Sequence, residues 1–294
     1  LDMRILFKVI ILFIMLLWTS IGYADEAKKI ISEASDKISS FITNTLGGGG
    51  LTEFSIDIPE DDVEIQYLNF KELSKDDLSN TFSQLSINTQ EINDDTRYIL
   101  NYGYGKRYLD ENKSLMTGMN AFVDYELEGH ARASLGLEAK AANLDFTANY
   151  YLALTNTETI NGTKERVLDG HELNLASQLP FMPWAKINYQ NYDFKKDKAA
   201  ENMGGNIVSL EMSLSPSIQF EASRNFISAS GYEDEDTYRI VYYNPPRNKS
   251  SMQDGLFSSN IFEKENIENK MIEKVRRRNN LTVEIQGAVI LTKQ

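Results

Sequence analysis

The sequence predicts an all-β protein: a twelve-stranded antiparallel transmembrane β-barrel, with a short helix before it and a helix and an extended linker after it. Three observations predict this fold. Polar and apolar residues alternate almost throughout residues 51–244, most alternating segments have roughly ten to fourteen residues, and their number is even. A tilted strand needs about nine to eleven residues to cross a bilayer, whereas strands of soluble domains usually have about five or six. An even number of strands returns both ends of the barrel to one side.

The composition narrows the class of protein. The chain has 294 residues, 41% hydrophobic residues and a formal net charge of −13. Nucleic-acid binders usually present a basic face, so we expect no nucleic-acid partner. The hydrophobic content is too low for a helical membrane protein but suits a barrel, in which only every second strand residue faces lipid. Without cysteine, the sequence offers no disulfide, thiol nucleophile or thiolate metal site.

Residues 1–24 have the pattern of a cleaved secretory signal peptide. A basic region with Arg4 and Lys8 precedes an unbroken apolar run, residues 9–17. Small residues stand at the positions that signal peptidase reads, so we expect cleavage between Ala24 and Asp25. The apolar run is too short to span a membrane comfortably as an anchor.

A periplasmic helical segment and a glycine linker are expected in residues 25–50. Apolar residues recur at helical spacing between Ala27 and Leu46, which predicts a short amphipathic helix. Four glycines, Gly47 to Gly50, end this helix because they have no side chains to pack and maximal backbone freedom.

The barrel itself is expected in residues 51–244, where the apolar period is two. A closed ring is required in lipid, because hydrocarbon offers no partner to an unpaired backbone group. Tyrosines near many expected strand ends suit the aromatic girdles of such barrels. The expected strands are residues 51–58, 63–73, 79–92, 95–108, 113–128, 130–141, 143–156, 165–177, 184–195, 203–214, 216–228 and 235–244, and the tyrosines are Tyr102, Tyr104, Tyr108, Tyr125, Tyr150, Tyr151, Tyr189, Tyr192, Tyr242 and Tyr243.

The clearest alternation lies in residues 115–141, which have the pattern of two strands of one hairpin. One face is apolar along its whole length, and the other carries full charges. A soluble sheet would turn the apolar face to a core, whereas a membrane barrel turns it to lipid and the charged face to a wet lumen. For a barrel, the expected lipid-facing residues are Leu135, Leu137, Phe146 and Leu152, and the expected lumen-facing residues are Asp124, Glu126, Arg132, Glu138 and Lys140.

The links between strands alternate in length. Outer-membrane barrels have short periplasmic turns and longer external loops, so the N-terminal end of the barrel is expected on the periplasmic side. The link at residues 128–130 is short although it falls on the external side. The short links are residues 142–143 and 215–217, and the long links are residues 156–164, 195–202 and 228–235.

Residues 245–294 form a separate C-terminal region. Pro245 and Pro246 end the last strand, because proline cannot donate to the ladder. Asn260 is expected to cap a helix that continues to Arg278, since apolar residues follow at helical spacing. Three arginines, Arg276, Arg277 and Arg278, suit a helix C-terminus. A short extended segment, residues 281–285, then alternates once more.

A series of motifs in this order resembles the β-domain of the intimin and invasin family, the inverse autotransporters. The resemblance covers residues 47–285 and is strongest in residues 102–192. The series is more specific than any single motif, such as the Asn-x-Phe-x-Asp of residues 120–124. The motifs are YGYGKRYL, MTGMNAFVDYELEGHARASLGLEA, LDFTANYYLALTN, DGHELNLASQLPFMPWAKINYQNY and RRRNNLTVEI.

The resemblance implies a secretion unit of the type V class. It implies an outer-membrane barrel, a lumenal helix that plugs it with Arg276, Arg277 and Arg278 among lumenal carboxylates such as Asp124, Glu126 and Glu138, and a linker that exports a passenger. The partners it implies are outer-membrane lipid and lipopolysaccharide, the barrel-assembly machinery and periplasmic chaperones. The sequence stops at Gln294, after the linker, so we expect no passenger domain here, and cell adhesion to a host or bacterial receptor only where a passenger is present.

No constellation of an enzyme or a cofactor site is apparent, so we expect neither a catalytic residue, nor a metal, nor a cofactor. His130 and His171 are the only histidines, and neither has a second histidine at metal-ligand spacing. A serine hydrolase would need a serine–histidine pair, but His171 and Ser177 lie too far apart along one strand.

Two alternatives remain open. The chain could be a free-standing porin-like or structural outer-membrane barrel that exports nothing. Less favoured is a soluble periplasmic β-sandwich that binds a ligand, because its strands would be unusually long.

Overall fold

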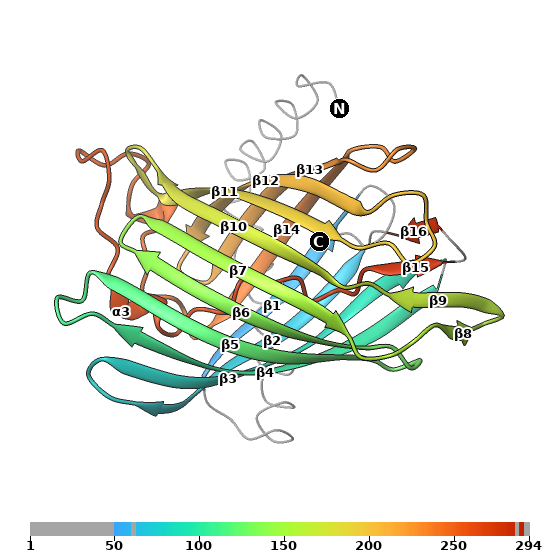
Figure 1. Cartoon of the computed structure of the whole chain (residues 1–294). Coiled ribbons are helices and arrows are strands. Elements are labelled where there is room, and N and C mark those ends of the chain that lie inside the picture. The colour runs from blue at the N-terminus through green and yellow to red at the C-terminus, as the bar shows by residue number, and fades with distance from the viewer. Residues whose placement is uncertain (1–49, 60–62, 94, 286–287, 291–294) are drawn as a thin grey trace. The chain divides into compact units, whose positions relative to one another are not determined.

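The computed structural model describes residues 50–59, 63–93, 95–285 and 288–290. These residues form a closed barrel of twelve antiparallel strands in which β1 pairs with both β2 and β14 (Figure 1). The predicted fold class is therefore confirmed. The expected signal peptide of residues 1–24 and the helix of residues 27–46 lie outside the described residues.

Eleven of the twelve barrel strands lie close to their predicted ranges, and β10 is the exception. The bounds are β1 Leu51–Ile58, β2 Glu64–Lys75, β3 Ser79–Ile92, β4 Asp95–Leu109, β5 Leu115–Glu126, β6 Ala131–Ala141, β7 Leu144–Ala153, β10 Gly170–Leu179, β11 Met182–Phe194, β12 Met203–Ser215, β13 Ile218–Ile227 and β14 Glu235–Asn244.

The strand predicted for residues 165–177 is wrong in its first half. The barrel strand begins only at Gly170, and Thr163–Val167 form a separate strand, β9, which pairs with β8, Glu158–Ile160. Asp169 separates the two, because its carboxylate accepts the N–H of Ala153 at 2.7 Å, where β7 ends. The hairpin β8–β9 thus leaves the barrel wall and continues beyond its rim.

The two ends of the barrel differ in their links. We call one the turn end, where neighbouring strands are joined by residues 76–78, 110–114, 142–143, 180–181 and 216–217. The other is the loop end, with links at residues 59–63, 93–94, 127–130, 154–169, 195–202 and 228–234. The longest links gather at the loop end, as the alternation in the sequence predicts, while residues 93–94 and 127–130 are short exceptions there.

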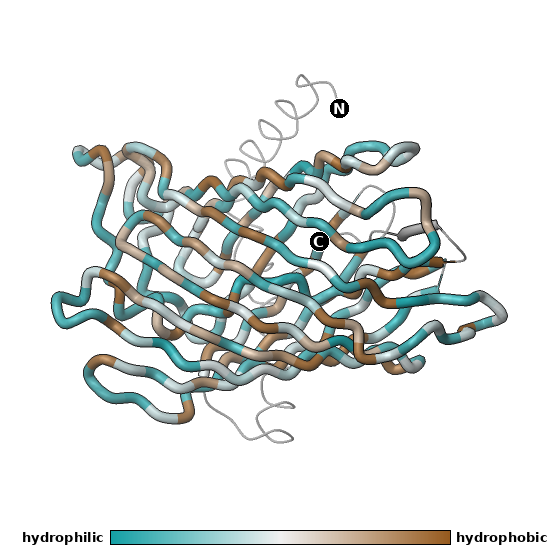
Figure 2. Tube along the Cα trace, in the orientation of Figure 1, coloured by the Kyte–Doolittle hydropathy of each residue, from teal (hydrophilic) through white to brown (hydrophobic). Residues whose placement is uncertain are grey.

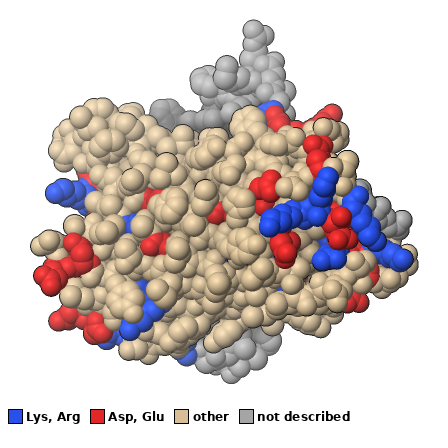
Figure 3. All heavy atoms as spheres, viewed as in Figure 1, with Lys and Arg blue, Asp and Glu red and all other residues tan. Residues whose placement is uncertain are grey.

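The barrel has an apolar outside and a polar inside. Hydrophobic and hydrophilic residues alternate along the strands (Figure 2). Leu135 and Leu137 are each 60% exposed on the outside, and Phe146 and Leu152 also face outward. On the face seen in Figure 3, charged side chains gather mainly towards the two ends of the barrel. Inside, the polar wall residues are buried, among them Asp124, Glu126, Arg132, Glu138 and Lys140.

Three of the tyrosines expected in girdles lie inside the barrel instead. Tyr151, Tyr192 and Tyr243 have inward parity on their strands and are almost completely buried. Tyr102 and Tyr104, in contrast, are 55% and 54% exposed on the outside. Closeness to a strand end does not determine the side of the wall; the period-two parity does.

The predicted helix of residues 260–278 is also wrong. Only Ile267–Lys270, α3, is α-helical there, after a 3₁₀ turn, η1, at Met252–Asp254. Beyond α3 the chain is irregular until the short strands β15, Val283–Ile285, and β16, Ala288–Ile290. Side chains of the barrel wall bond the peptide groups that a helix would use internally. Among the described residues no helix is long and apolar enough to span a membrane.

Candidate functional site: the occupied barrel lumen

Residues 271–282, here called the lumenal segment, run through the barrel from the turn end to the loop end (Figure 1). Three apolar clusters trace this path in order. Met271 packs with Leu109 and Met116, which flank a link of the turn end. Val275 packs in a middle cluster and Leu281 in a cluster at the loop end. The middle cluster contains Leu68, Phe70, Phe82 and Phe122, and the loop-end cluster contains Ile92, Ile99, Val167, Val283 and Ile285.

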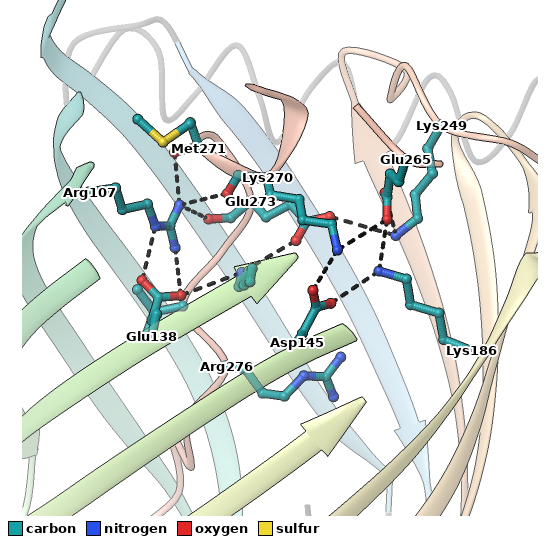
Figure 4. Close-up of polar contacts among 12 residues, drawn as sticks. Arg107, Glu138, Asp145, Lys186, Lys249, Glu265, Lys270, Met271, Glu273 and Arg276 are labelled. Carbon is teal, nitrogen blue, oxygen red and sulfur yellow. Dashed lines mark hydrogen bonds and ion pairs between the residues drawn. The ribbon is translucent and has the colours of Figure 1, made fainter. Parts of the chain in front are cut away.

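Arg107 of β4 binds the start of the lumenal segment (Figure 4). Its Nη1 donates to the carbonyl oxygens of Met271 at 2.8 Å and Glu273 at 2.6 Å. Its Nε and Nη2 donate to the carboxylate of Glu138 at 2.9 and 3.0 Å, which holds the guanidinium in place. The guanidinium also lies 4.5 Å from the ring centre of Phe82, a cation–π contact. One guanidinium therefore binds the main chain of Met271 and Glu273 and also, at 3.4 Å, the carbonyl of Lys270 just before the segment.

The same kind of contact continues along the lumenal segment. Gln90 of β3 makes the most complete one, because its amide donates to the carbonyl of Leu281 and accepts the N–H of the same residue, both at 2.8 Å. Hydrogen bonds to a main-chain N–H or carbonyl do not depend on which side chain the bound residue has. Further contacts join Gln84 to the Val275 N–H, Asn149 to the Arg276 carbonyl, Asn101 to the Asn279 carbonyl, and Arg132 to the carbonyls of Arg278 and Asn280.

The three consecutive arginines of the lumenal segment each meet a carboxylate on a different strand. Arg277 pairs with Asp124 of β5 at 2.6 Å. Arg278 lies 4.0 Å from Glu172 of β10, and Arg276 pairs with Glu211 of β12. The segment is therefore held in one register by side chains as well as by its main chain.

Of the three carboxylates expected around these arginines, the structure brings only Asp124 to them. Glu138 is bound by Arg107. Glu126 lies near the loop end, 3.9 Å from Arg97. Glu172 and Glu211, which sequence reasoning missed, take the remaining places. Their only signal in the sequence was inward parity on strands β10 and β12.

Glycines of the motif YGYGK make room for aromatic rings in the lumen. A Cβ on Gly103 would meet the ring of Phe122 at 2.2 Å, and a Cβ on Gly105 would meet Phe82 at 2.4 Å. No side chain larger than hydrogen fits against these rings. Phe122 lies under the guanidinium of Arg277, 4.3 Å from its ring centre. The two glycines thus leave space for Phe82 and Phe122, on which Arg107 and Arg277 stack. The tyrosines of the motif, Tyr102 and Tyr104, point to the outside of the barrel.

A network of lysines and carboxylates ties the chain to the wall at the turn end (Figure 4). Lys186 of β11 reaches Asp145 and Glu265 at 3.1 Å each. Burial favours the neutral acid of Glu265, but the ammonium groups of Lys249 and Lys186 outweigh it and hold the pKa of this carboxyl below its ordinary value. The network also joins Lys270 to Asp145 and Glu265, Lys249 to Glu265 and Glu273, and Lys140 to Glu273.

A polar cavity of about 160 Å³ remains beside the lumenal segment. Charged residues of β1, β2, β13 and β14 line one side of it. Arg239 binds Asp57 there through two hydrogen bonds of 2.5 and 2.6 Å. The lumenal segment therefore narrows the lumen but leaves part of the barrel interior unfilled. Glu53, Glu64 and Glu221 are further lining residues on that side.

The two histidines lie apart. His130 is buried at the loop end, with Nε2 3.4 Å from Glu165. His171 lies on the outer face of β10, as does Ser177. Within the described part of the chain, no three or more His, Cys, Asp or Glu side chains are grouped so that they could hold a metal ion.

Comparisons with known proteins agree with this architecture. The family model "Inverse autotransporter, beta-domain" matches residues 21–279. "Inverse autotransporter adhesin YeeJ" of Escherichia coli (strain K12) is 26% identical over 268 residues, which are 85% of this chain but 11% of that protein. A solved structure described as "Unveiling the Mechanism Behind the in-meso Crystallization of Membrane Proteins" has a TM-score of 0.63 and 17% identity, and the match covers 80% of this chain and 100% of that one. At 17% identity, this likeness shows the fold alone.

Proposed function

The chain belongs to the inverse autotransporter β-domain family, and from this premise we propose that its barrel is an outer-membrane anchor and a passage for its own C-terminal region. The single observation that carries the proposal is the lumenal segment. The last barrel strand, β14, ends at the turn end, yet the chain re-enters there and leaves at the loop end. The chain spans 11% of the length of this E. coli relative.

The anchor is explained by the outside of the barrel. The outward-facing apolar side chains, with Leu135, Leu137, Phe146 and Leu152 among them, contact lipid. Every barrel strand has two paired neighbours, so no strand edge meets hydrocarbon. The longest links lie at the loop end, which therefore faces the cell exterior, and the turn end faces the periplasm. Lipopolysaccharide surrounds the loop end in this orientation.

The path to the membrane requires export and assembly. Residues 1–24 direct the chain across the inner membrane and are removed between Ala24 and Asp25. Periplasmic chaperones and the barrel-assembly machinery then receive the chain, because its apolar strand faces would aggregate in water. N-terminal sequencing of the protein purified from outer membranes would show Asp25 first, and any other first residue would contradict this cleavage site.

The passage is explained by how the wall holds the lumenal segment. Contacts to peptide groups from Arg107, Gln90 and their neighbours suit any extended chain, so they would hold successive segments in transit equally well. The three arginines, in contrast, fit only one register. We assign to them the role of a stop that fixes the chain when transit ends. No chemical step is catalysed in this function.

A fusion tests the passage. An immunoglobulin-like domain joined after Gln294 is expected to bind antibody on intact cells. The matched control joins the same domain after Asn244, at the turn end, and is expected to bind antibody only after the cells are permeabilised. A barrel that is folded in the outer membrane but keeps the first fusion in the periplasm would overturn the passage and favour a structural or porin-like barrel.

A further inference from the structure

The chain that leaves the lumen becomes a strand of a small sheet at the loop end. This sheet has the order β16-β15-β9-β8, so β15 is added to the free side of the hairpin β8–β9 (Figure 1). The N–H of Leu168 donates to the carbonyl of Thr282 at 3.0 Å. The register is Val283 opposite Val167, Glu284 opposite Arg166 and Ile285 opposite Glu165.

A second loop holds the middle residue of β15. The carboxylate of Glu284 accepts the main-chain N–H of Asp197 at 2.8 Å and that of Lys198 at 2.7 Å. Its cross-strand partner Arg166 pairs with Asp197 at 3.1 Å, which draws the loop of residues 195–202 over the sheet. Glu284 is only 4% exposed. Two N–H donors to one buried carboxylate are charge-assisted hydrogen bonds, and these are the strong ones.

The hairpin β8–β9 is itself fastened to the barrel wall. Glu165 accepts two hydrogen bonds from Arg97 of β4, at 2.6 and 2.7 Å, and both side chains are buried. Val167 packs in the loop-end apolar cluster together with Val283. The site for β15 is thus rigid on three sides: the hairpin, the wall and the loop of residues 195–202.

We propose that the hairpin β8–β9 and the N–H groups of Asp197 and Lys198 form an exit dock, a binding site for an extended peptide segment with an apolar–acidic–apolar sequence. Its occupant is residues 283–285 of this chain. Main-chain pairing supplies binding that tolerates different sequences, and the carboxylate site selects an acidic residue at the central position.

The exit dock determines which residue of the chain stands at the rim of the barrel. It also resists sliding of the chain back into the lumen, because every backward step breaks both the strand pairing and the carboxylate contact. The docking itself does not depend on transport, but its role as an exit rests on the proposed passage function.

Cysteine cross-linking in the full chain tests the register. The natural sequence has no cysteine, so two introduced cysteines have no competitor. The Leu168–Thr282 bond makes Val167 and Val283 a non-hydrogen-bonded pair, with Cα atoms about 4.5 Å apart, within reach of a disulfide. Oxidised with copper phenanthroline in outer membranes, V167C/V283C is expected to form a disulfide. The offset pair V167C/T282C, which keeps Glu284, is expected to remain reduced, because successive strand residues point to opposite faces.

The carboxylate site is tested by hydrogen exchange at Leu168, whose N–H bond exists only in the docked chain. In E284A we expect this exchange to accelerate on the order of tenfold, because charge-assisted hydrogen bonds are lost. The matched control is E158A, which removes an exposed carboxylate from β8 of the same sheet and should leave the exchange unchanged. A faster gel migration of the unheated protein shows that each variant has kept its barrel.

The outcomes separate the dock from the passage. Equal cross-linking of the two cysteine pairs, no cross-linking in a folded barrel, or equal exchange in E284A and E158A would each overturn the exit dock. If the disulfide forms as expected while the fusion after Gln294 stays periplasmic, the dock stands and the passage function fails. If the fusion reaches the surface without the V167C/V283C disulfide forming, the passage stands and the dock fails.

Discussion

Two arginines of the barrel wall, Arg107 and Arg132, combine three kinds of contact. Each binds a carboxylate of the wall, stacks on an aromatic ring and donates to the main chain of the lumenal segment. Lysine could not replace them, because only a planar guanidinium offers both a fork of donors and a stacking face. The partners are Glu138, Phe82 and Met271 for Arg107, and Asp124, Tyr151 and Arg278 for Arg132.

Asp124 is the residue whose loss should cost most in the lumen. It stands between Arg132 at 2.7 Å and Arg277 at 2.6 Å, and all three side chains are buried from solvent. In D124A two arginines would face each other without a counter-charge, so we expect a loss of about 3–5 kcal/mol of unfolding free energy, measured by denaturant titration of the barrel. R277A leaves the Asp124–Arg132 pair intact and should cost less. Equal losses in the two variants would contradict this account.

The facing of β6 gives a second prediction at the residue scale. L135K places a charge on the outward face, where Leu135 is 60% exposed, and near the bilayer midplane this should cost about 2–4 kcal/mol of unfolding free energy. The adjacent Ser134 is no suitable control, because its hydroxyl accepts a hydrogen bond from Arg277. S223K is the control instead, since Ser223 lines the polar cavity beside Asp57 and Glu221. If L135K and S223K lose similar amounts of unfolding free energy in the same denaturant titration, Leu135 does not face lipid.

At the scale of elements, the lumenal segment shows how tertiary surroundings override local preference. Its apolar residues recur at helical spacing, but Ile267 and Met271 belong to one cluster and Val275 to another further along the barrel. An extended chain covers about twice the length per residue of a helix, so it can cross the lumen with fewer residues. The wall supplies the hydrogen bonds that the helix would have made.

Removal of this element should open the pore. Deletion of residues 260–294 takes away the lumenal segment and leaves a polar interior, so we expect a higher single-channel conductance in planar bilayers than in the full chain. Deletion of residues 286–294 alone keeps the lumenal segment and should leave the conductance as it is. The same conductance after both deletions would show that the segment does not fill the lumen in the membrane.

For the whole molecule, closure of the ring is the decisive property. The pairing of β1 with β14 joins the two ends of the sheet and removes both open edges. A barrel whose every strand is paired on both sides should resist detergent until it is heated. We therefore expect the unheated protein to migrate faster in SDS gels than the boiled protein. Identical migration would mean that the closed ring does not resist SDS before heating.

Much of this molecule follows from its sequence, because period-two alternation is a local property. In residues 115–141 the parity of each side chain follows from its neighbours two positions away, so Leu135 and Glu138 could be assigned to opposite faces without a structure. Strand length and the even strand number then predicted the closed ring. The same reasoning placed Asp124 inside, where Arg277 meets it.

The contacts of the lumen could be decided only by the tertiary structure, because they join residues far apart in the chain. Gln90 and Leu281 are 191 positions apart, and nothing local indicates that an amide of β3 will bind that peptide group. The helix predicted up to Arg278 failed for the same reason, since the wall competes for its backbone groups. The prediction of a barrel strand from residue 165 failed for the same reason. Glu165 is bound by Arg97, and β9 pairs with β15 instead of with the barrel wall. The sequence by itself thus determined which side of the wall most residues face, and the closed barrel determined what they bind there.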